Sequence, residues 1–274
     1  MFLDYVFHSH TYRCGHAQKD IDDYVVKCIN NGYKKYGVSD HVFLPGVHCP
    51  GMRGDYSLLN EYINEYNRCK NIYEKKIEMY LGFECEYSAY YIEYYKSLLY
   101  EKGFDYLICG QHLGFDENGK VYSYFDVPDN EEGLFRYRDD LIDAIKSGLF
   151  LYVAHPDLFF LFATKVTPIY ERITKELLDV FEIFDTVIEI NINGFLREKT
   201  HNGVTYIDYP CDYFWEEVSK RNIRVVVGGD FHNPDVIDDQ QVINNVEEFI
   251  KRHNLKLVDI NDVYNQYQQR IRKY

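Results

Sequence analysis

The chain has 274 residues, of which 46% are hydrophobic, so it is long enough and apolar enough to bury a domain-sized core. Its 30 basic and 44 acidic residues give a formal net charge of −14, which disfavours nucleic acid as a partner. Seven cysteines without a CxxC pair fit neither a disulfide framework nor a structural zinc ribbon. The sequence shows neither a signal-peptide pattern nor an apolar run of membrane-spanning length. We therefore expect a soluble, cytoplasmic protein without a membrane partner.

Short apolar runs alternate with stretches of helical periodicity along the whole chain. The runs predicted as strands are 3–8, 36–40, 78–86, 105–110, 150–155, 187–193 and 224–230. The stretches predicted as helices are 20–31, 57–77, 88–101, 133–148, 170–184, 211–221 and 240–252. No linker rich in proline, glycine and serine interrupts this alternation, so residues 1–274 are predicted to form a single α/β domain.

The side chains at the strand ends distinguish a closed barrel from an open sheet. In a barrel every strand can contribute to one site at the C-terminal mouth, whereas an open sheet draws on the few strands at its switch point. Nearly every predicted strand ends in a histidine or a carboxylate, in the segments FHSH, SDH, GFECE, GQH, AHPD and GGDFH. This distribution favours a barrel.

Two strand ends carry potential ligands two residues apart, which places both side chains on one side of an extended segment. His8 and His10 form one pair and could grip one ion together. Asp230 and His232 form the other, after an apolar run and two glycines that allow close approach. Each pair alone could be an ordinary polar feature, with Asp230 capping the next helix. The presence of both pairs favours metal binding.

Glu84 and Glu86 lie on one face of an otherwise apolar strand, where an inward carboxylate needs a cation. Because a carboxylate can bridge two ions, we choose Glu84 as the bridge and keep Glu86 as the alternative. The other glutamate is expected to form a salt bridge at the barrel rim. His112 and His155 end consecutive strands and are expected to project side by side. His16 lies in the loop CGHA, where a histidine could equally be solvated.

The candidate metal ligands share a position at or just after a strand end. They are His8, His10, His16, His41, Glu84, His112, His155, Asp230 and His232. This set exceeds the coordination sphere of one ion, and two or three ions about 3.5–4 Å apart are what it could hold.

The motifs HSH, CGHA, SDH, GFECEY, GQH, AHPD and GGDFH, in this order, resemble those of the polymerase and histidinol phosphatase (PHP) superfamily. The similarity runs from His8 to His232, and the motifs are most similar to those of the stand-alone histidinol-phosphate phosphatases. The resemblance implies a distorted (β/α)7 TIM-like barrel with three divalent ions of zinc, manganese or iron. It places His8, His10, Glu84 and Asp230 on one ion, Glu84, His112 and His155 on a second, and His16, His41 and His232 on a third.

The activity implied by this resemblance is hydrolysis of L-histidinol phosphate to L-histidinol and phosphate in histidine biosynthesis. The ions would activate water for in-line attack on phosphorus, and Glu84, Asp230 and His232 are the candidate catalytic residues. Asp230 or a neighbouring histidine would collect the proton. Arg197, in the segment NGFLR, resembles the phosphate-binding loop of the family, and its planar fork suits phosphate oxygens. A solvated loop arginine is the alternative.

Several further groups are assigned less specific roles. The basic residue that related phosphatases often carry after the fifth strand is absent from DLFF, so Arg138 or Lys165 would have to replace it. His48, His201 and His253 have no strand-end setting and are predicted to be surface residues.

Two other functions remain open at this point. The first is hydrolysis of another small phosphomonoester, such as a nucleotide, a sugar phosphate or phosphotyrosine, because the metal ligands do not distinguish these substrates. The second is a non-catalytic, metal-binding regulatory protein, which would not need a bridged, water-bearing cluster. The sequence also leaves open whether the chain forms a homo-oligomer.

Overall fold

The computed structural model describes residues 3–115, 120–124, 131–201 and 203–272. Its central feature is a curled parallel sheet, of which four strands pair in the order β1-β2-β3-β4 and two further strands, β10 and β7, pair with each other. These strands are β1 Tyr5–Val6, β2 Lys35–Val38, β3 Glu78–Cys85, β4 Tyr106–Cys109, β7 Val187–Asn191 and β10 Arg224–Gly228. All of these pairings are parallel.

Isolated bridges join the two parts of the sheet into a ring. Val153 bridges Cys109 of β4 on one side and Ile188 of β7 on the other. Ser9, just beyond β1, bridges Phe231, just beyond β10, and the backbone N–H of His10 donates to the carbonyl of Phe231 at 2.9 Å. The predicted strand 150–155 therefore exists as a bridged segment rather than as a regular strand. The ring is closed, as the predicted barrel requires.

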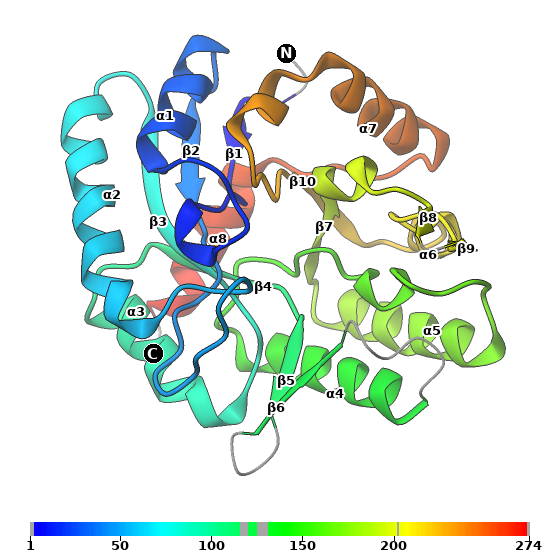
Figure 1. Cartoon of the computed structure of the whole chain (residues 1–274). Coiled ribbons are helices and arrows are strands. Elements are labelled where there is room, and N and C mark those ends of the chain that lie inside the picture. Colours follow the sequence, from blue (N-terminus) through cyan, green and yellow to red (C-terminus); the bar gives the residue numbers. More distant parts are fainter. Residues whose placement is uncertain (1–2, 116–119, 125–130, 202, 273–274) are drawn as a thin grey trace.

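Helices surround the strands, as expected for parallel strands joined by crossovers (Figure 1). Their bounds are α1 Ile21–Asn30, α2 Leu59–Tyr73, α3 Ile92–Tyr100, α4 Glu131–Ser147, α5 Pro168–Ile183, α6 Asp212–Ser219 and α7 Gln240–Arg252. Each lies within four residues of its predicted range at either end. The start of α1 shows the local cause, because Asp20 and Asp23 form a capping box that satisfies free backbone N–H groups.

One helix, α8 (Ile260–Ile271), was not predicted. It lies behind the strands in Figure 1, and its buried side chains pack against residues of the barrel interior. The Tyr267 hydroxyl accepts a hydrogen bond from the backbone N–H of Leu107 at 3.3 Å and donates to the carbonyl of Leu149 at 2.9 Å. This helix therefore closes the end of the barrel opposite the mouth.

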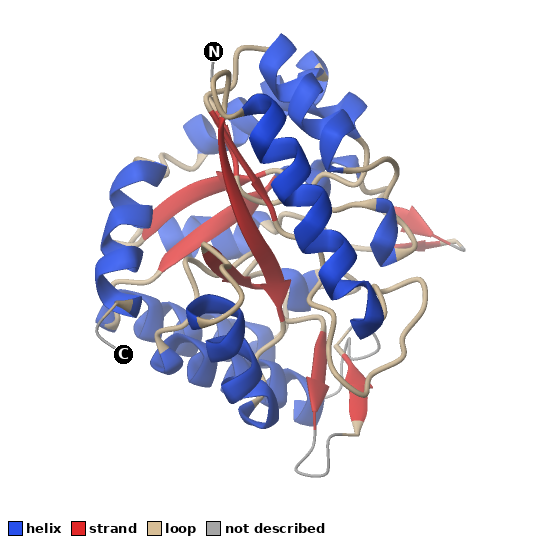
Figure 2. Ribbon diagram, turned by 90° about the vertical axis from the view of Figure 1, so that its left-hand side faces the viewer, coloured by secondary structure: helices blue, strands red, loops and turns tan. Residues whose placement is uncertain are grey.

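The loops at the mouth contain two antiparallel hairpins and several short 3-10 helices. The hairpins project from the barrel (Figure 2) and consist of β5 Leu113–Phe115 with β6 Val121–Ser123, and β8 Thr200–His201 with β9 Val204–Thr205. The 3-10 helices are η1 Tyr12–Cys14, η2 Tyr56–Leu58, η3 Ala89–Tyr91, η4 Leu158–Phe160, η5 Ile192–Leu196 and η6 Pro234–Asp238. Within the described part of the chain, no helix is both long enough and apolar enough to span a membrane.

Candidate metal centre

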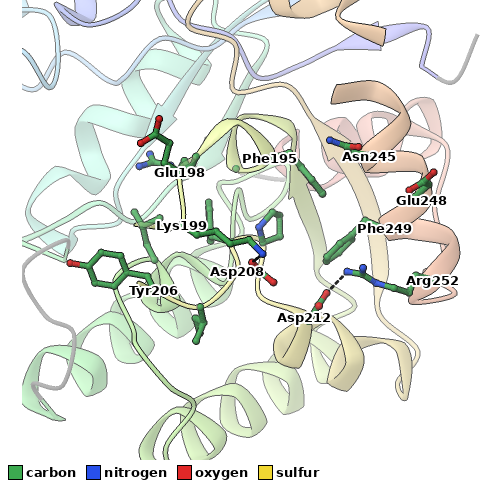
Figure 3. A pocket seen from close by; sticks show the side chains of 16 residues that line it. Phe195, Glu198, Lys199, Tyr206, Asp208, Asp212, Asn245, Glu248, Phe249 and Arg252 are labelled. Atoms are coloured by element: carbon green, nitrogen blue, oxygen red, sulfur yellow. Dashed lines mark hydrogen bonds and ion pairs between the residues drawn. The ribbon is translucent and has the colours of Figure 1, made fainter. Parts of the chain in front are cut away.

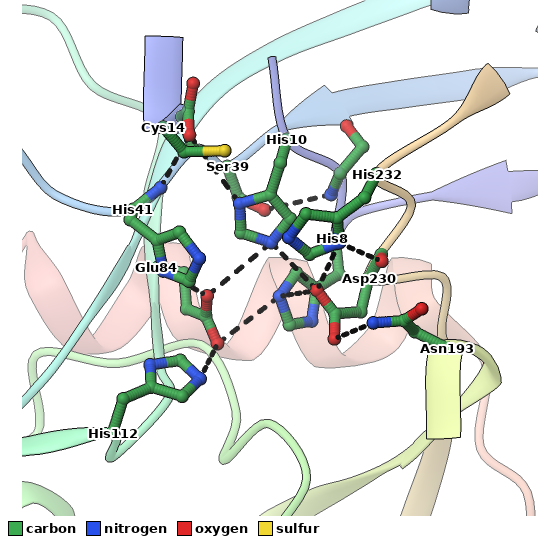
Figure 4. Close-up of polar contacts among 12 residues, drawn as sticks. His8, His10, Cys14, Ser39, His41, Glu84, His112, Asn193, Asp230 and His232 are labelled. Atoms are coloured by element: carbon green, nitrogen blue, oxygen red, sulfur yellow. Dashed lines mark hydrogen bonds and ion pairs between the residues drawn. The ribbon is translucent and has the colours of Figure 1, made fainter. Parts of the chain in front are cut away.

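All nine predicted ligands gather at the mouth of the barrel. Figure 4 labels all of them except His16 and His155. The buried members are His8, His10, His41, Glu84, His112, His155 and Asp230. His232 is partly exposed and His16 is exposed, so these two form the outer edge of the cluster. Their side-chain nitrogen and oxygen atoms fall into overlapping groups whose members lie within 4.8 Å of one another, and the group that contains His16 and His232 also includes Cys14 Sγ. This arrangement can hold more than one metal ion.

Glu84 is the hub of the cluster. Five histidine nitrogens approach its two oxygens: His155 Nε2 at 2.7 Å, His41 Nδ1 at 3.0 Å, His8 Nε2 at 3.4 Å, His112 Nε2 at 3.5 Å and His10 Nε2 at 3.6 Å. The carboxylate occupies space left by Gly110, where an added Cβ would lie 1.9 Å from Glu84 Oε1. The two oxygens of Glu84 thus face different histidines, which is the arrangement that a carboxylate bridging two ions requires.

Asp230 is held in a fixed orientation beside the first two histidines. Its Oδ2 accepts hydrogen bonds from the side-chain amides of Asn191 at 3.0 Å and Asn193 at 3.2 Å. Its Oδ1 lies 2.9 Å from His10 Nε2 and 3.5 Å from His8 Nε2. One oxygen is therefore anchored by neutral donors, and the other faces the centre.

His16 and His232 lie in contact at the outer edge of the cluster, in an arrangement that a bound cation would stabilise. Their Nε2 atoms lie 2.9 Å apart. His232 Nδ1 faces the carbonyl of Asp230 at 2.8 Å, and His16 Nδ1 faces the carbonyl of Cys14 at 3.3 Å. Since a carbonyl only accepts, both Nδ1 atoms carry the proton in the neutral rings, which leaves two Nε2 lone pairs facing each other. A shared cation would relieve that repulsion.

The deeper ligand atoms also fit a set of cations. Among the described residues, the buried atoms without a hydrogen-bond partner include His8 Nε2, both ring nitrogens of His10, His41 Nδ1 and Glu84 Oε2. Buried polar atoms are normally satisfied, so a cluster of unsatisfied ones at one point indicates a missing partner. These atoms lie close to one another but do not align as donors and acceptors. A metal ion, which accepts lone pairs from several directions, fits this geometry.

The electrostatics of the cluster keep its inner carboxylates ionised and its outer histidines neutral. Burial alone would raise the pKa of Glu84 and Asp230, but the surrounding histidines hold both pKa values well below the ordinary range. Burial and the neighbouring His10 lower the pKa of His41 well below its usual value and that of His232 to about 3. The carboxylates are therefore ionised and these outer imidazoles neutral, which are the protonation states that ligate metal.

Strained backbone conformations coincide with two of the candidate ligands. His155 has a φ of 31° and Asp230 a φ of 48°, in a region that residues other than glycine seldom adopt. Both residues stand where a strand segment passes into a loop. Such strain persists where surrounding structure enforces it, and it is common at functional sites.

Glu86 lies outside the centre, as expected for whichever glutamate is not the bridge. It forms a two-pronged salt bridge with Arg53, with N–O distances of 2.7 and 3.0 Å, and its Oε1 lies 3.3 Å from His112 Nδ1. This ion pair is buried rather than at the rim. Sequence reasoning did not identify Arg53, because the long loop after β2 gave no signal of its destination.

A cleft of about 220 Å³ opens over the centre. It is lined by His16, His41, Met52, His112, Asn193, Arg197, Asp230 and His232. Arg197 therefore lies at the cleft over the candidate centre, and its binding of phosphate stays a prediction. The proposed substitutes for a second basic residue do not reach it: Arg138 forms ion pairs with Asp139 and Glu176, and Lys165 is an exposed residue that does not line the cleft.

The histidines outside the candidate centre differ in their exposure to solvent. The side chain of His48 is 79% exposed, as predicted. The prediction that His253 is a surface residue was wrong, because it is buried against Phe249 and its Nε2 lies 2.9 Å from a carboxylate oxygen of Asp212. The side chain of His201 lies outside the described part of the structure.

A closed α/β barrel whose mouth gathers histidines and carboxylates around one centre is the architecture of a metal-dependent hydrolase. A family model described as the PHP domain matches residues 7–193, which is more than half of the sequence, and the chain belongs to this family. With the candidate metal centre that its barrel builds, the chain is a PHP-family metal-dependent phosphoesterase.

Individual proteins support the family assignment. A protein of Deinococcus radiodurans named a probable histidinol-phosphatase is 26% identical over 233 residues, covering 83% of this chain and 85% of the relative. A protein of Schizosaccharomyces pombe with the same name is 24% identical over 255 residues, covering 83% and 80%. The crystal structure of histidinol phosphate phosphatase from Lactococcus lactis, complexed with zinc, L-histidinol and phosphate, matches with a TM-score of 0.66 at 17% identity, covering 93% and 95%. This structural match confirms the distorted barrel.

Proposed function

We propose that the protein hydrolyses L-histidinol phosphate to L-histidinol and phosphate. The observation that carries a hydrolytic centre is the convergence of buried, unsatisfied histidine and carboxylate atoms on the two sides of Glu84. The choice of substrate is supported by the two relatives named probable histidinol-phosphatases and by the L. lactis enzyme, which was crystallised with L-histidinol and phosphate.

The centre is proposed to hold two to three ions of zinc, manganese or iron. Following the family resemblance, we assign His8, His10, Glu84 and Asp230 to the first ion, Glu84, His112 and His155 to the second, and His16, His41 and His232 to the third. The ligand atoms that lie within 4.8 Å of one another support a polynuclear centre but group differently, since Glu84 groups with His8 and His155 on one side and with His41 and His112 on the other. Bound divalent ions supply Lewis acidity toward phosphoryl oxygens and lower the pKa of water to near neutrality.

The protein's own groups then bind the substrate and handle the proton. Arg197, at the edge of the cleft, is proposed to bind two phosphate oxygens through its planar guanidinium. Asp230 is the proposed proton acceptor, because Asn191 and Asn193 fix its Oδ2 while Oδ1 faces the centre. His232 is the alternative acceptor at the outer edge, but only while its Nε2 is not bound to an ion, because its Nδ1 already carries a proton.

Figure 3 shows a second cavity, of about 290 Å³. Arg197 lines both this cavity and the cleft, so the two are adjacent. Phe195 and Phe249 contribute apolar surface to it, and Glu198 and Glu248 contribute carboxylates. A phosphate held at Arg197 could therefore direct an organic group with a cationic amine into this cavity. Histidinol phosphate has such an amine, and the cavity is our proposed site for the organic half of the substrate.

The proposed activity is tested by phosphate release from metal-loaded protein. L-Histidinol phosphate should give the highest kcat/KM in a panel with a nucleoside monophosphate, a sugar phosphate and phosphotyrosine. Higher kcat/KM for another member would retain the phosphatase and replace the substrate. The absence of phosphate release from every substrate by protein shown to contain its metals would overturn the proposed activity.

Metal content gives a prediction that does not depend on the substrate. We expect protein reconstituted with manganese, zinc or iron to retain two to three equivalents per chain after removal of free metal, because the ligand set exceeds a mononuclear sphere. Elemental analysis against protein concentration provides the measurement. A reproducible value of one equivalent or less would exclude the polynuclear centre.

Arg197→Ala is expected to raise KM and to lower kcat/KM, with unchanged metal content. The decrease should correspond to a loss of about 1–3 kcal/mol of transition-state stabilisation, which is the usual contribution of a hydrogen bond to a charged group. Arg197→Lys should recover only part of the loss, because an ammonium cannot reproduce two-pronged contact. Arg138→Ala is the matched control, since Arg138 pairs with Glu176 away from the cleft. Wild-type kcat/KM in Arg197→Ala would show that the phosphate is bound elsewhere.

A further inference from the structure

A further carboxylate, Glu189, is fully buried within the barrel but is not among the predicted ligands. It lies in the middle of β7, whose five residues Val187–Asn191 are all buried. Its Oε1 and Oε2 lie 3.1 and 2.9 Å from His8 Nδ1, and the Asn191 side-chain amide donates to Oε1 at 3.2 Å. A carboxylate at such a position is costly unless a group of opposite charge or a strong donor faces it. His8 is that group.

The two ring nitrogens of His8 have different surroundings. Nδ1 faces Glu189, whereas Nε2 has no hydrogen-bond partner among the described residues and points into the cluster. Nε2 lies 3.4 Å from Glu84 Oε1 and 3.5 Å from Asp230 Oδ1. An ionised carboxylate only accepts hydrogen bonds, so Nδ1 must carry the proton toward Glu189. When metal displaces the second proton of the ring, the lone pair of Nε2 is then directed at the centre.

We propose that Glu189 is a positioning residue, which accepts a hydrogen bond from His8 Nδ1 and thereby fixes the ring orientation and tautomer in which His8 Nε2 binds metal. This inference rests on the proposed metal centre. A carboxylate on the far nitrogen of a ligating histidine also increases the basicity of the ring, so it strengthens the metal bond as well as aiming it. Glu189 itself does not contact the substrate.

The neighbouring strand leaves space for this carboxylate. Gly228 of β10 is paired in register with Asn191, and a Cβ added at Gly228 would lie 1.8 Å from Glu189 Oε2. Gly228→Ala would therefore displace the carboxylate of Glu189 while keeping its charge. A substitution on a different strand thus tests the same contact.

The experiment is a titration of metal-free protein with a single metal in competition with a chromogenic chelator. Glu189→Ala is expected to weaken the site that contains His8 by about 10–100-fold, the usual cost of losing an outer partner of a metal-binding histidine. Glu189→Gln, which keeps an acceptor but not the charge, should lose less. Asp105→Asn is the control, because Asp105 accepts hydrogen bonds from Leu81 N and Tyr66 outside the centre. It should leave the metal affinity unchanged.

A purely structural role gives a different result. It would lower the melting temperatures of the metal-free and metal-loaded proteins equally, whereas a positioning role reduces the rise that metal produces. If Glu189→Ala does not fold, Gly228→Ala and Glu189→Gln provide the same two readouts. Wild-type metal affinity in the folded variants would overturn the inference. Because neither readout uses a phosphoester, the result is independent of whether histidinol phosphate is the substrate.

Discussion

Glu84→Ala is expected to lower kcat by more than about 100-fold and to remove at least one metal equivalent per chain. The reason is geometric, because the two oxygens of one carboxylate approach ligands assigned to two ions, with His155 Nε2 2.7 Å from Oε1 and His10 Nε2 3.6 Å from Oε2. Its loss separates ligands that would hold different ions, so the effect should exceed the 10–100-fold that is typical of outer partners. Turnover and elemental analysis on the same preparation measure both consequences.

Glu86→Ala is the matched comparison, and its main effect should be on stability. Its carboxylate neutralises the buried Arg53, and removal of one partner of a buried ion pair costs about 3–5 kcal/mol. Glu86→Gln keeps a hydrogen-bonding group there and should cost less. Below their melting temperatures, both Glu86 variants should retain more metal and activity than Glu84→Ala. If Glu86→Ala is inactive while Glu84→Ala retains its metal and rate, the bridge has been assigned to the wrong glutamate.

The sequence was sufficient for the elements whose signal is local. Helix α1 has buried side chains at Ile21, Tyr24, Val25 and Cys28, a spacing that is visible without the fold. Helix α8 was not predicted because its apolar positions are sparse among polar residues. These positions are buried only by packing against the barrel, which the local sequence does not show. The segment 150–155 was placed correctly between β4 and β7, but its pairing is limited to isolated bridges.

The same distinction holds for the site, where some residues could be identified from their local sequence and others depend on contacts between distant parts of the chain. The candidate ligands other than His16 could be found because they stand at strand ends, where parallel strands bring distant residues to one mouth. Their supporting residues could not, because Glu189 reaches His8 across 181 positions and Arg53 reaches Glu86 across 33. A glutamate inside the apolar run VIEIN was the one available signal for Glu189. His253 was misjudged for the same reason, since Asp212 is 41 positions away.

Proton binding and metal binding compete for the inner histidines. Burial opposes their protonation, yet Glu189, Glu84 and Asp230 raise the pKa of His8 well above its ordinary value, and Asp230 and Asp40 raise that of His10 to about 9. Because these folded-state pKa values exceed the unfolded value of about 6.5, the stability that they contribute to the metal-free protein is fully present below about pH 6.5. It is lost as the pH rises through the folded pKa values.

Removal of the metal ions by a chelator is therefore expected to lower the melting temperature by an amount that grows between about pH 6 and pH 8.5. Metal must displace protons from His8 and His10, so its affinity rises with pH over the range in which the metal-free protein loses stability. At a free concentration about 1000-fold above Kd, one ion adds about 4 kcal/mol, or about 8–16 °C in a chain of this size. Thermal unfolding with and without chelator across this pH range measures the difference. His48→Gln is the control, because this exposed histidine lies outside the cluster. A difference that stays constant or shrinks with rising pH would show that proton release from the inner histidines is not coupled to metal binding.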